Sequence, residues 1–419
     1  MLSRPRPLQR IRKALEIHPV AALMGPRQCG KTTLAQLVTE ERGGTYVTLD
    51  DDATREAVLA DPITFLVDQR HPLTVDEVQL GGDRLVRAVK QLVDADATPG
   101  RFLLTGSTNF LAVPSISESL AGRVRILRLW PLSEAELANV RTMAIDQWFE
   151  GSMMDSGSVP SVTRTDYLDR ACRGGYPEVV NLDERHRHDW FDSYVETVTQ
   201  RDLVALADIR KTTSLRRLLR WSAAITSNEL NVSEAARDLG IDRATVVSYL
   251  EWLQVVFLVH ELPAWSRNLT ARASRRPKLH LTDTGLAADL LGVSSDALAA
   301  PTAPATGPLL ESFVVNEIAR ELSSSPTRIG LFHYRDHREH EVDLILERSD
   351  GAIIAIEVKA TSSPTAGQLG HVEWLKEKVD AASPGRFQAG ILLHTGTQSV
   401  TVGDRLHLRP ISVLWSNQV

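Results

Sequence analysis

Short apolar runs alternate with helix-patterned segments over the first third of the chain. Residues 19–34 predict a buried strand, a glycine-bounded loop and the start of a helix. Residues 83–93 have the spacing of apolar positions typical of a helix. Four more strand-like runs lie at 45–49, 73–75, 101–105 and 125–129. This alternation predicts a mainly parallel sheet with helices on both faces.

The middle of the chain has a mainly helical pattern. Residues 148–163 are rich in Gly, Ser and Met without periodicity, which predicts a surface loop or hinge. The pattern is helical over 165–206, where a turn at 174–177 interrupts it. Residues 229–258 predict a short helix, a turn at Gly240 and a second helix, which is a helix-turn-helix layout.

A stretch rich in Pro, Ala and Thr at 300–308 precedes a tail of mixed pattern. Strand-like runs LFHYRD, EVDLILE, AIIAIEVKA and AGILLHT alternate there with helical patterns at 308–322 and 368–378. We therefore expect a multidomain α/β protein. The changes of pattern divide it into four predicted parts, at 1–160, 161–208, 209–282 and 283–419.

Composition fits a folded protein of several domains. The chain has 419 residues, whereas one domain takes about 150. Hydrophobic residues make up 43% and charged residues 24%, which excludes the collagen-like, disordered and disulfide-scaffold classes. The net charge of −6 gives no general attraction to nucleic acid, so any such contact requires a local basic patch.

Three features favour a cytoplasmic location. Cys29 and Cys172 are too few for a disulfide framework and fit a reducing compartment. The longest apolar stretch, at 255–259, is far shorter than the about 20 residues that cross a bilayer, so no membrane contact is expected. The arginine-rich start, MLSRPRPLQRIRKAL, predicts an ordinary first helix, although a transit peptide has a similar composition.

Residues 25–32, GPRQCGKT, match the phosphate-binding motif G-x-x-x-x-G-K-[ST] between a strand and a helix. Lys31 can neutralise the β- and γ-phosphates, Thr32 can ligate magnesium, and Cys29 is expected to be a small packing residue. The expected ligands are therefore ATP or ADP and Mg²⁺. The residues expected to bind them are Gly25, Pro26, Arg27, Gln28, Cys29, Gly30, Lys31, Thr32 and Thr33.

Two carboxylates follow the apolar run at 73–75 in PLTVDEVQ. Asp76 is expected to hold magnesium through water, and Glu77 to polarise the attacking water. An ordinary solvated strand end is the alternative for an isolated pair of this kind. The phosphate-binding motif makes the catalytic interpretation the favoured one.

Polar and basic residues later in the core complete the predicted site. The run LLTGSTN places Thr105, Ser107 and Asn109 beside it, and we expect Asn109, narrowly ahead of Ser107, to sense the γ-phosphate. Charge on the transferred phosphoryl group also calls for a cation, which a neighbouring subunit can supply. Arg123 in SESLAGR is the candidate, and a surface ion pair is the alternative.

Together these motifs resemble bacterial and archaeal AAA-type ATPases whose C-terminal half is the domain of unknown function numbered 4143. GPRQCGKTTL, LTVDEVQ, LLTGSTNF, ESLAGR and RGGYPEVV occur in that family's order over nearly the whole chain. The resemblance implies a P-loop AAA-type core at 1–160, a helical lid at 161–208, a winged helix-turn-helix at 209–282 and a restriction-endonuclease-like domain at 283–419.

Charged residues in the tail suggest a second site. Asp343, Glu357 and Lys359 form D-x₁₃-E-x-K across two predicted strands, and alternation puts Glu357 and Lys359 on one face. In PD-(D/E)XK nucleases such carboxylates hold magnesium, while the lysine orients or activates water. Glu317 would suit the extra acidic position of such folds. Without the family resemblance, an ordinary charged strand face is the favoured interpretation.

Histidines and arginines suggest two further contacts. His333, His337 and His340 are close in sequence but lack the helical spacing of a zinc site, so we do not expect zinc there. The predicted second helix of the helix-turn-helix presents Arg243, Thr245 and Ser248 outward if its apolar residues Val246, Val247, Leu250 and Leu253 pack inward.

A basic run follows the helix-turn-helix where a wing would lie. It supplies enough charge for phosphate contacts, so DNA is a plausible partner. The alternatives are a packing module with a solvated basic surface. The residues concerned are Arg267, Arg272, Arg275, Arg276 and Lys278.

The function favoured by these motifs is an ATP-binding and ATP-hydrolysing protein that couples nucleotide state to DNA binding or processing. One alternative is a slow nucleotide-dependent switch that binds DNA or a protein partner and has an inert nuclease-like domain. Another is a component of a defence or toxin–antitoxin system. A role for Arg123 between chains would imply a homo-oligomer.

Overall fold

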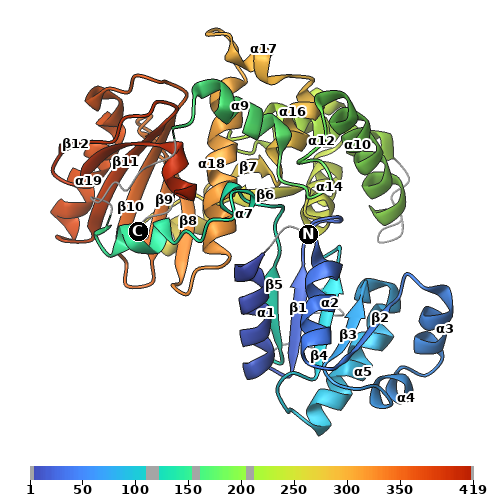
Figure 1. The fold of residues 1–419 in the computed structure, drawn as a ribbon. Helices are drawn as coiled ribbons and strands as arrows, with labels where there is room; N and C mark the ends of the chain where they lie inside the picture. Colours follow the sequence, from blue (N-terminus) through green and yellow to red (C-terminus); the bar gives the residue numbers. More distant parts are fainter. Residues whose placement is uncertain (1–3, 110–121, 153–160, 204–211, 417–419) are drawn as a thin grey trace. The chain divides into compact units, whose positions relative to one another are not determined.

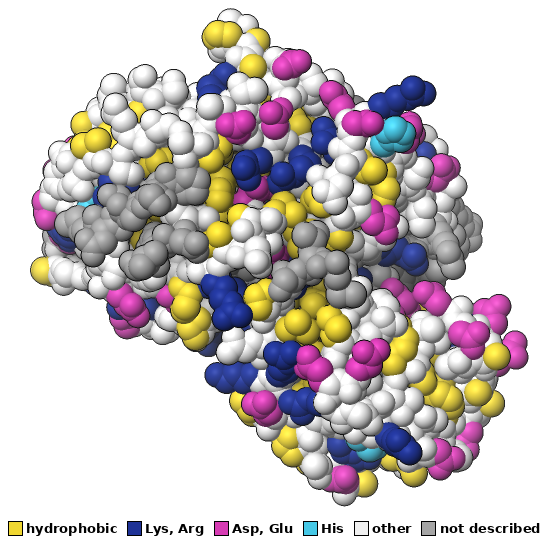
Figure 2. Space-filling model, viewed as in Figure 1, with side chains coloured by type: hydrophobic (Ala, Val, Ile, Leu, Met, Phe, Trp, Pro, Cys, Tyr) yellow, Lys and Arg dark blue, Asp and Glu magenta, His cyan; other side chains and the backbone are white. Residues whose placement is uncertain are grey.

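A computed structural model describes residues 4–109, 122–152, 161–203 and 212–416 (Figure 1). The chain forms two compact units, Met1–Pro131 with Trp252–Leu258, and Leu132–Glu251 with Val259–Val419. None of the described helices has the length and apolar character needed to cross a membrane. Acidic and basic side chains are interspersed on the face shown in Figure 2, in keeping with the small net charge of −6.

The first unit is built on a five-stranded sheet with the order β2-β3-β4-β1-β5. Every pairing in it is parallel, which confirms the prediction. The short apolar runs of the sequence form its strands: β1 (Val20–Met24), β2 (Thr45–Thr48), β3 (Leu73–Asp76), β4 (Phe102–Gly106) and β5 (Val124–Arg128).

Helices cover both faces of this sheet, as the alternating pattern predicted. Apolar residues of α1 (Pro5–Ile17) and α2 (Lys31–Glu41) pack with Leu103 and Leu127. Those of α5 (Gly82–Ala95) pack with Val75 and Leu104 from the other side. The described part of the unit also contains two shorter helices, α3 (Asp52–Ala60) and α4 (Pro62–Val67), and a 3₁₀ turn, η1 (Val78–Gly81).

The second unit begins with helices and a small antiparallel pair of strands, β6 (Val259–Leu262) and β7 (Lys278–Leu281). The helices α13 (Val232–Leu239) and α14 (Arg243–Val255) flank Gly240, as predicted, and the end of α14 belongs to the first unit. The other helices among the described residues before the tail are α7 (Glu134–Leu137), α8 (Ala144–Phe149), α9 (Arg164–Arg173), α10 (Glu184–Thr197), η4 (Val198–Asp202), α12 (Thr212–Ala224), α15 (Leu269–Ser274), α16 (Thr284–Leu291) and α17 (Ser295–Ala299).

The tail carries a six-stranded mixed sheet with the order β12-β13-β11-β10-β9-β8. Its apolar core includes Ile345, Leu375 and Phe387. The strands are β8 (Ile329–Arg335), β9 (Glu341–Arg348), β10 (Ile353–Lys359), β11 (Phe387–His394), β12 (Val400–Gly403) and β13 (Leu406–Pro410). The helices are α18 (Thr306–Leu322), η5 (Ala366–Leu369), α19 (Gly370–Ala382) and η6 (Ile411–Trp415).

The division between the units lies after Pro131, before the boundary predicted at residue 160. Leu132 donates a backbone hydrogen bond to Gly175 (2.6 Å), and Glu134 forms ion pairs with Arg170 and Arg173 of α9. These contacts hold the segment after β5 to the second unit. The loop predicted at 148–163 begins instead with two buried residues of α8, and 153–160 lie outside the described residues.

Candidate functional site

The phosphate-binding motif lies between the end of β1 and the start of α2. Strand β1 pairs with β4 on one side and β5 on the other, so the loop emerges at the carboxyl edge of the sheet. A Cβ atom on Gly25 would lie 2.1 Å from the Leu129 carbonyl oxygen. No side chain fits there, because the loop backbone runs directly against the segment after β5.

Buried contacts support the loop. The Lys31 ammonium donates to the Pro26 carbonyl oxygen (2.7 Å), and Arg4 donates to the Cys29 carbonyl oxygen (2.8 Å). Cys29 is fully buried, and burial raises the pKa of its thiol. A buried neutral thiol is a packing group, as expected for Cys29.

Asp76 is the centre of the polar contacts beside the loop. It ends β3 with 3% of its surface exposed. Its carboxylate accepts hydrogen bonds from the hydroxyls of Thr32 (2.8 Å), Tyr46 (2.6 Å) and Thr105. Magnesium prefers hard oxygen ligands, and a threonine hydroxyl beside a carboxylate is a donor set that fits it.

Glu77 has a strained backbone that turns it from the strand direction. Its φ of 53° is in the left-handed region, where a non-glycine residue costs about 1–3 kcal/mol. The Ser107 hydroxyl (2.9 Å) and the Gln79 side-chain amide both donate to Glu77 Oε2. The carboxylate is thus held at the carboxyl edge of the sheet, next to Asp76.

The residue that the structure brings to Glu77 is Ser107, which the sequence ranked second to Asn109. Ser107 is buried, and both its hydroxyl and its backbone N–H donate to Glu77 Oε2. Asn109 is placed through its main chain, where its N–H donates to the Val255 carbonyl oxygen (2.8 Å). Ser107 is therefore the better candidate for a residue that acts with Glu77.

Arg123 lies at the wrong edge of the sheet to reach its own phosphate loop. Strands β1 and β5 are parallel with Val20 opposite Val124, so Arg123 lies at the amino edge. It forms an ion pair with Asp94 (2.5 Å), which is the alternative considered from the sequence. Arg123 therefore does not reach the γ-phosphate of its own chain, and its role from a neighbouring subunit stays a prediction.

The arginine at the correct edge is Arg128, which sequence reasoning missed. It lies opposite Met24 at the end of β5. Its guanidinium stacks over the rings of Trp130 (3.8 Å) and Phe257 (5.3 Å), and burial lowers its pKa to about 10. Only the strand register shows that Arg128 lies at the edge of the phosphate loop and Arg123 at the opposite edge. The sequence pattern does not give this register.

The predicted tail residues lie on adjacent antiparallel strands, Asp343 on β9 and Glu357 and Lys359 on β10. Lys359 Nζ lies 2.6 Å from Glu357 Oε1, and the Val358 N–H donates to Asp343 Oδ2 (2.8 Å). Burial, followed by the charge of Asp343, raises the pKa of Glu357 to about 7. The structure thus brings these three side chains together.

A lysine from outside the predicted set enters the same site. Lys278 of β7 is 2% exposed, and its Nζ lies 2.8 Å from both Glu311 Oε1 and Glu341 Oε1, and 3.8 Å from Asp343 Oδ1. Burial lowers its pKa, but the charges of the three carboxylates outweigh this effect and hold the pKa above its usual value. Burial and the charge of Asp343 raise the pKa of Glu311 to about 8.

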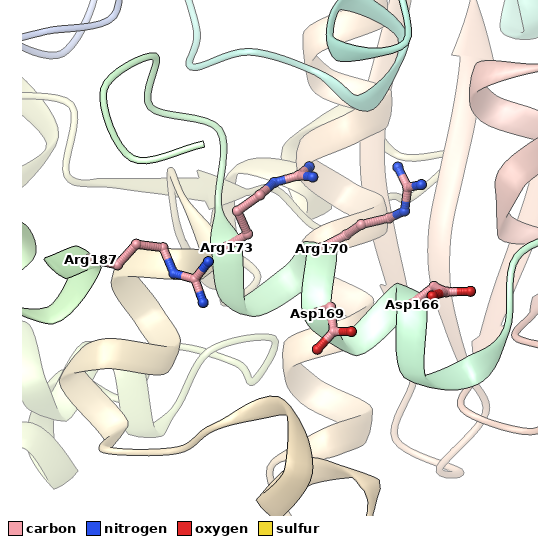
Figure 3. A pocket seen from close by; sticks show the side chains of 5 residues that line it. All are labelled: Asp166, Asp169, Arg170, Arg173 and Arg187. Carbon is pink, nitrogen blue, oxygen red and sulfur yellow. The ribbon is translucent and has the colours of Figure 1, made fainter. Parts of the chain in front are cut away.

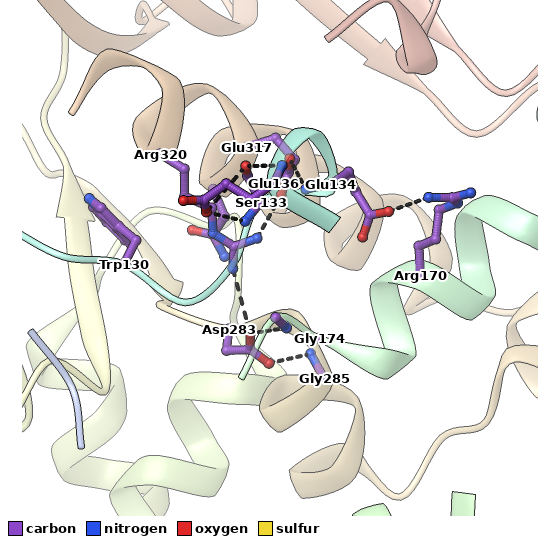
Figure 4. A network of polar contacts seen from close by, with 12 residues as sticks. Trp130, Ser133, Glu134, Glu136, Arg170, Gly174, Asp283, Gly285, Glu317 and Arg320 are labelled. Carbon is purple, nitrogen blue, oxygen red and sulfur yellow. Dashed lines mark hydrogen bonds and ion pairs between the residues drawn. The ribbon is translucent and has the colours of Figure 1, made fainter. Parts of the chain in front are cut away.

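Glu311 is the acidic residue that α18 contributes to the site around Asp343 and Lys278. The expectation that Glu317 takes this position is wrong. Glu317 pairs with Arg320 (2.6 Å) and accepts a hydrogen bond from the Glu134 backbone N–H (2.9 Å) (Figure 4). Glu317 lies six positions after Glu311, which is about 240° further round the helix axis at 3.6 residues per turn. They therefore lie on different faces of α18.

The basic run after the helix-turn-helix is largely engaged within the second unit. Lys278 is buried, and Arg272 forms two hydrogen bonds with Glu347 (2.6 and 2.9 Å). Both residues are therefore wrong as predicted phosphate contacts. The three that are exposed are Arg267, Arg275 and Arg276.

One helix face differs from expectation, and two of the three histidines have different surroundings. Val247 of α14 is 40% exposed, whereas Val246, Leu250 and Leu253 are buried as predicted. His333 is buried against the Arg276 carbonyl oxygen, and burial lowers its pKa to about 4. His340 instead stacks on Trp374, with ring centroids 3.8 Å apart. The two rings thus have separate partners.

The RGGYP motif packs within the second unit. A Cβ atom on Gly174 would lie 2.1 Å from Asp283 Oδ1, and the Gly175 N–H donates to Asp283 Oδ2 (2.7 Å). Asp283 also caps α16 through the backbone N–H groups of Gly285 and Leu286. Gly174 is therefore required for the close approach of the end of α9 to Asp283, and Gly175 for a close approach to the Leu132 carbonyl oxygen.

An open pocket of about 350 Å³ lies along α9. Figure 3 shows Arg170 and Arg173 extending to one side of the helix and Asp169 to the other. Both of these arginines form ion pairs with the single carboxylate of buried Glu134, which balances one of their two charges. The lining residues are Asp166, Asp169, Arg170, Arg173 and Arg187.

Family models match three consecutive parts of the chain. Residues 18–138 match an AAA domain, residues 164–297 the domain of unknown function DUF8612, and residues 306–414 the domain of unknown function DUF4143. The first match contains the phosphate loop, Asp76 and Glu77. The third contains Asp343, Glu357 and Lys359.

Two mycobacterial proteins are similar over most of the chain. The uncharacterized proteins Rv2008c of Mycobacterium tuberculosis and Mb2031c of Mycobacterium bovis are each 34% identical over 359 residues, which are 85% of this chain and 74% of theirs. Among solved structures, a Walker-type ATPase of Pyrococcus abyssi, PABY2304, matches 69% of this chain and 96% of its own with 16% identity and a TM-score of 0.42. The family matches and the two relatives confirm the resemblance read from the sequence motifs. The chain belongs to the family of AAA-type P-loop ATPases that carry a C-terminal DUF4143 domain.

Proposed function

We propose that this chain binds ATP with magnesium at the phosphate loop and hydrolyses it. The arrangement around Asp76 and Glu77 carries the proposal. Thr32 and Asp76 present two hard oxygens 2.8 Å apart beside Lys31, and Glu77 follows Asp76 directly. Such a pair of oxygens suits magnesium, and Glu77 at the same edge of the sheet would act as the general base.

Each residue has one task in the proposed reaction. Lys31 and the loop amides bind the β- and γ-phosphates, and Thr32 and Asp76 would hold magnesium, which neutralises phosphate charge when bound. A water oxygen attacks the γ-phosphorus while Glu77 accepts a proton from that water. The bond from the γ-phosphorus to the β–γ bridging oxygen breaks, which releases ADP and phosphate.

Phosphate release from ATP in magnesium, compared with release in EDTA, tests turnover. We expect multiple turnovers in magnesium and none in EDTA. Phosphoryl transfer requires a metal ion that neutralises the negative charge of the phosphate groups, and EDTA removes this ion. Bound ATP without release in either condition would support the alternative, a slow nucleotide-dependent switch. Equal release in both conditions would contradict the roles of Thr32 and Asp76.

Ser107→Ala should slow phosphate release about tenfold with little change in ATP affinity. The hydroxyl donates to the Glu77 carboxylate, and a hydrogen bond to a charged group contributes about 1.5–3 kcal/mol. Asn109→Ala is the matched control and should have a smaller effect. Steady-state kinetics with a separate measurement of ATP binding checks both. The reverse order of effects would restore Asn109 as the sensing residue.

Coupling of nucleotide state to DNA is the second part of the proposal. Helices α13 and α14 with strands β6 and β7 have the order of a winged helix-turn-helix, and Arg243, Arg275 and Arg276 are exposed. We expect these arginines to contact DNA phosphates, and salt should therefore weaken the binding of the chain to duplex DNA. Arg275→Ala with Arg276→Ala should weaken it further, and Arg87→Ala on α5 should not. Equal DNA affinity of wild type, the double variant and Arg87→Ala would mean that Arg275 and Arg276 do not contact DNA.

A homo-oligomer belongs to the same proposal. Because Arg123 lies at the opposite edge of the sheet from its own loop, it acts at a phosphate only on a second copy of the chain. Sedimentation equilibrium of the Glu77→Gln variant with magnesium and ATP tests this assembly. A monomer at every concentration would exclude Arg123 from the site.

A further inference from the structure

The ammonium of Lys278 lies among three carboxylates, which we call the tail acidic cluster: Glu311, Glu341 and Asp343. They come from α18 and β9, and the lysine comes from β7. The nitrogen is 2.8 Å from two of them and 3.8 Å from the third. An ammonium group has three N–H donors, so it can face all three carboxylates.

Two of the four carboxylate oxygens of Asp343 and Glu357 have a partner within hydrogen-bond distance, and a third faces an ammonium group. Asp343 directs one oxygen at the Val358 N–H and the other towards Lys278. Glu357 directs one oxygen at Lys359, and its Oε2 is buried without a hydrogen-bond partner. Within residues 4–109, 122–152, 161–203 and 212–416, no three Asp, Glu, His or Cys side chains are placed to hold a metal ion.

The donor set therefore does not fit the magnesium expected at Asp343 and Glu357. Magnesium requires close to octahedral oxygen ligation and sheds its water reluctantly. A fixed ammonium beside the same carboxylates repels a dication, and this repulsion is strong where water is excluded. Lys278 is 2% exposed, so solvent does not screen its charge.

We propose that Lys278 takes the place of a divalent metal in the tail acidic cluster. The cation of this site is part of the polypeptide, and the cluster holds β7, β9 and α18 together without a bound ion. The tail consequently binds no free divalent metal through Asp343 and does not cleave DNA with it. This inference goes beyond ATP hydrolysis and is independent of it.

Manganese binding to the full chain without nucleotide tests the proposal, with free Mn²⁺ measured by electron paramagnetic resonance. Wild type and Asp343→Asn should bind Mn²⁺ equally. Lys278→Met should gain one site that fills at millimolar or lower Mn²⁺ and that wild type lacks, and adding Asp343→Asn should abolish it. Lys376→Met, which removes a lysine of α19, should gain none.

The comparison of wild type with Asp343→Asn tests the proposal even if Lys278→Met fails to fold. An Mn²⁺ site of wild type at millimolar or lower concentration that Asp343→Asn removes would overturn the proposal. So would DNA cleavage in Mn²⁺ that is lost in the same variant. Mn²⁺ held at the phosphate loop does not depend on Asp343, so the result stands apart from the proposed hydrolysis of ATP.

Discussion

Glu77→Gln is expected to slow phosphate release about 10²–10⁴-fold, the contribution typical of a general base, while ATP still binds. The amide has the size of the carboxylate but cannot accept the proton of the attacking water. Ser107 and Gln79 donate to Glu77 in the native chain, so the side chain stays ordered near its native place. Steady-state phosphate release together with equilibrium binding of ATP measures the two effects separately.

Glu56→Gln is the matched control, because Glu56 is an exposed residue of α3 in the same unit. Its rate should equal that of wild type. Equal rates for Glu77→Gln and wild type would mean that another group accepts the proton. A parallel loss of binding and turnover would show that Glu77 supports the nucleotide site and is not its base.

Lys278→Met is expected to lower the free energy of unfolding by about 3–5 kcal/mol, the range for a buried ion pair that loses one partner. Methionine keeps much of the volume but leaves three carboxylates facing one another with no cation among them. Protonation relieves that repulsion, so the loss of stability should be smaller at pH 5 than at pH 8. Urea unfolding at both pH values measures it.

Lys376→Met supplies the comparison for this prediction. Lys376 is half-buried but pairs with exposed Asp404, so its loss should change the free energy of unfolding by less than about 1 kcal/mol. Equal stability of both variants and wild type would contradict the account of the tail acidic cluster. A loss of stability that does not depend on pH would assign the effect of Lys278 to packing alone.

Local motifs were enough to predict the core of the first unit. The phosphate loop, the strand before it and the helix after it are contiguous, and each later strand is a short apolar run. Asp76 and Glu77 follow such a run directly, so their place at the edge of a parallel sheet follows from the direction of the strand. No long-range information was required for these features.

Features that depend on distant pairing could not be predicted in this way. Lys278 appears in the sequence as one member of a basic run, and its partner Glu311 lies 33 residues further along the chain. Arg272 pairs with Glu347, 75 residues away. Both residues appear in the sequence as part of a surface patch, but in the structure they form ion pairs within the second unit.

Helix rotation and strand register explain two other differences between the predictions and the structure. Glu311 and Glu317 lie on one helix, and only its rotation shows which of them faces β9. Arg123 and Arg128 lie at opposite ends of one strand, and only the parallel pairing of β5 with β1 shows which end is near the phosphate loop. A motif supplies residue types, whereas the choice between neighbours of the same type requires the fold.

The most direct test of this account is equilibrium binding of a fluorescent ATP analogue, with magnesium, to wild type and to Lys31→Ala. We expect saturable binding by wild type below millimolar concentration and at least a tenfold loss in the variant, since Lys31 neutralises phosphate charge and each factor of ten is about 1.4 kcal/mol. No uptake by wild type at millimolar concentration, or equal uptake by both proteins, would contradict it.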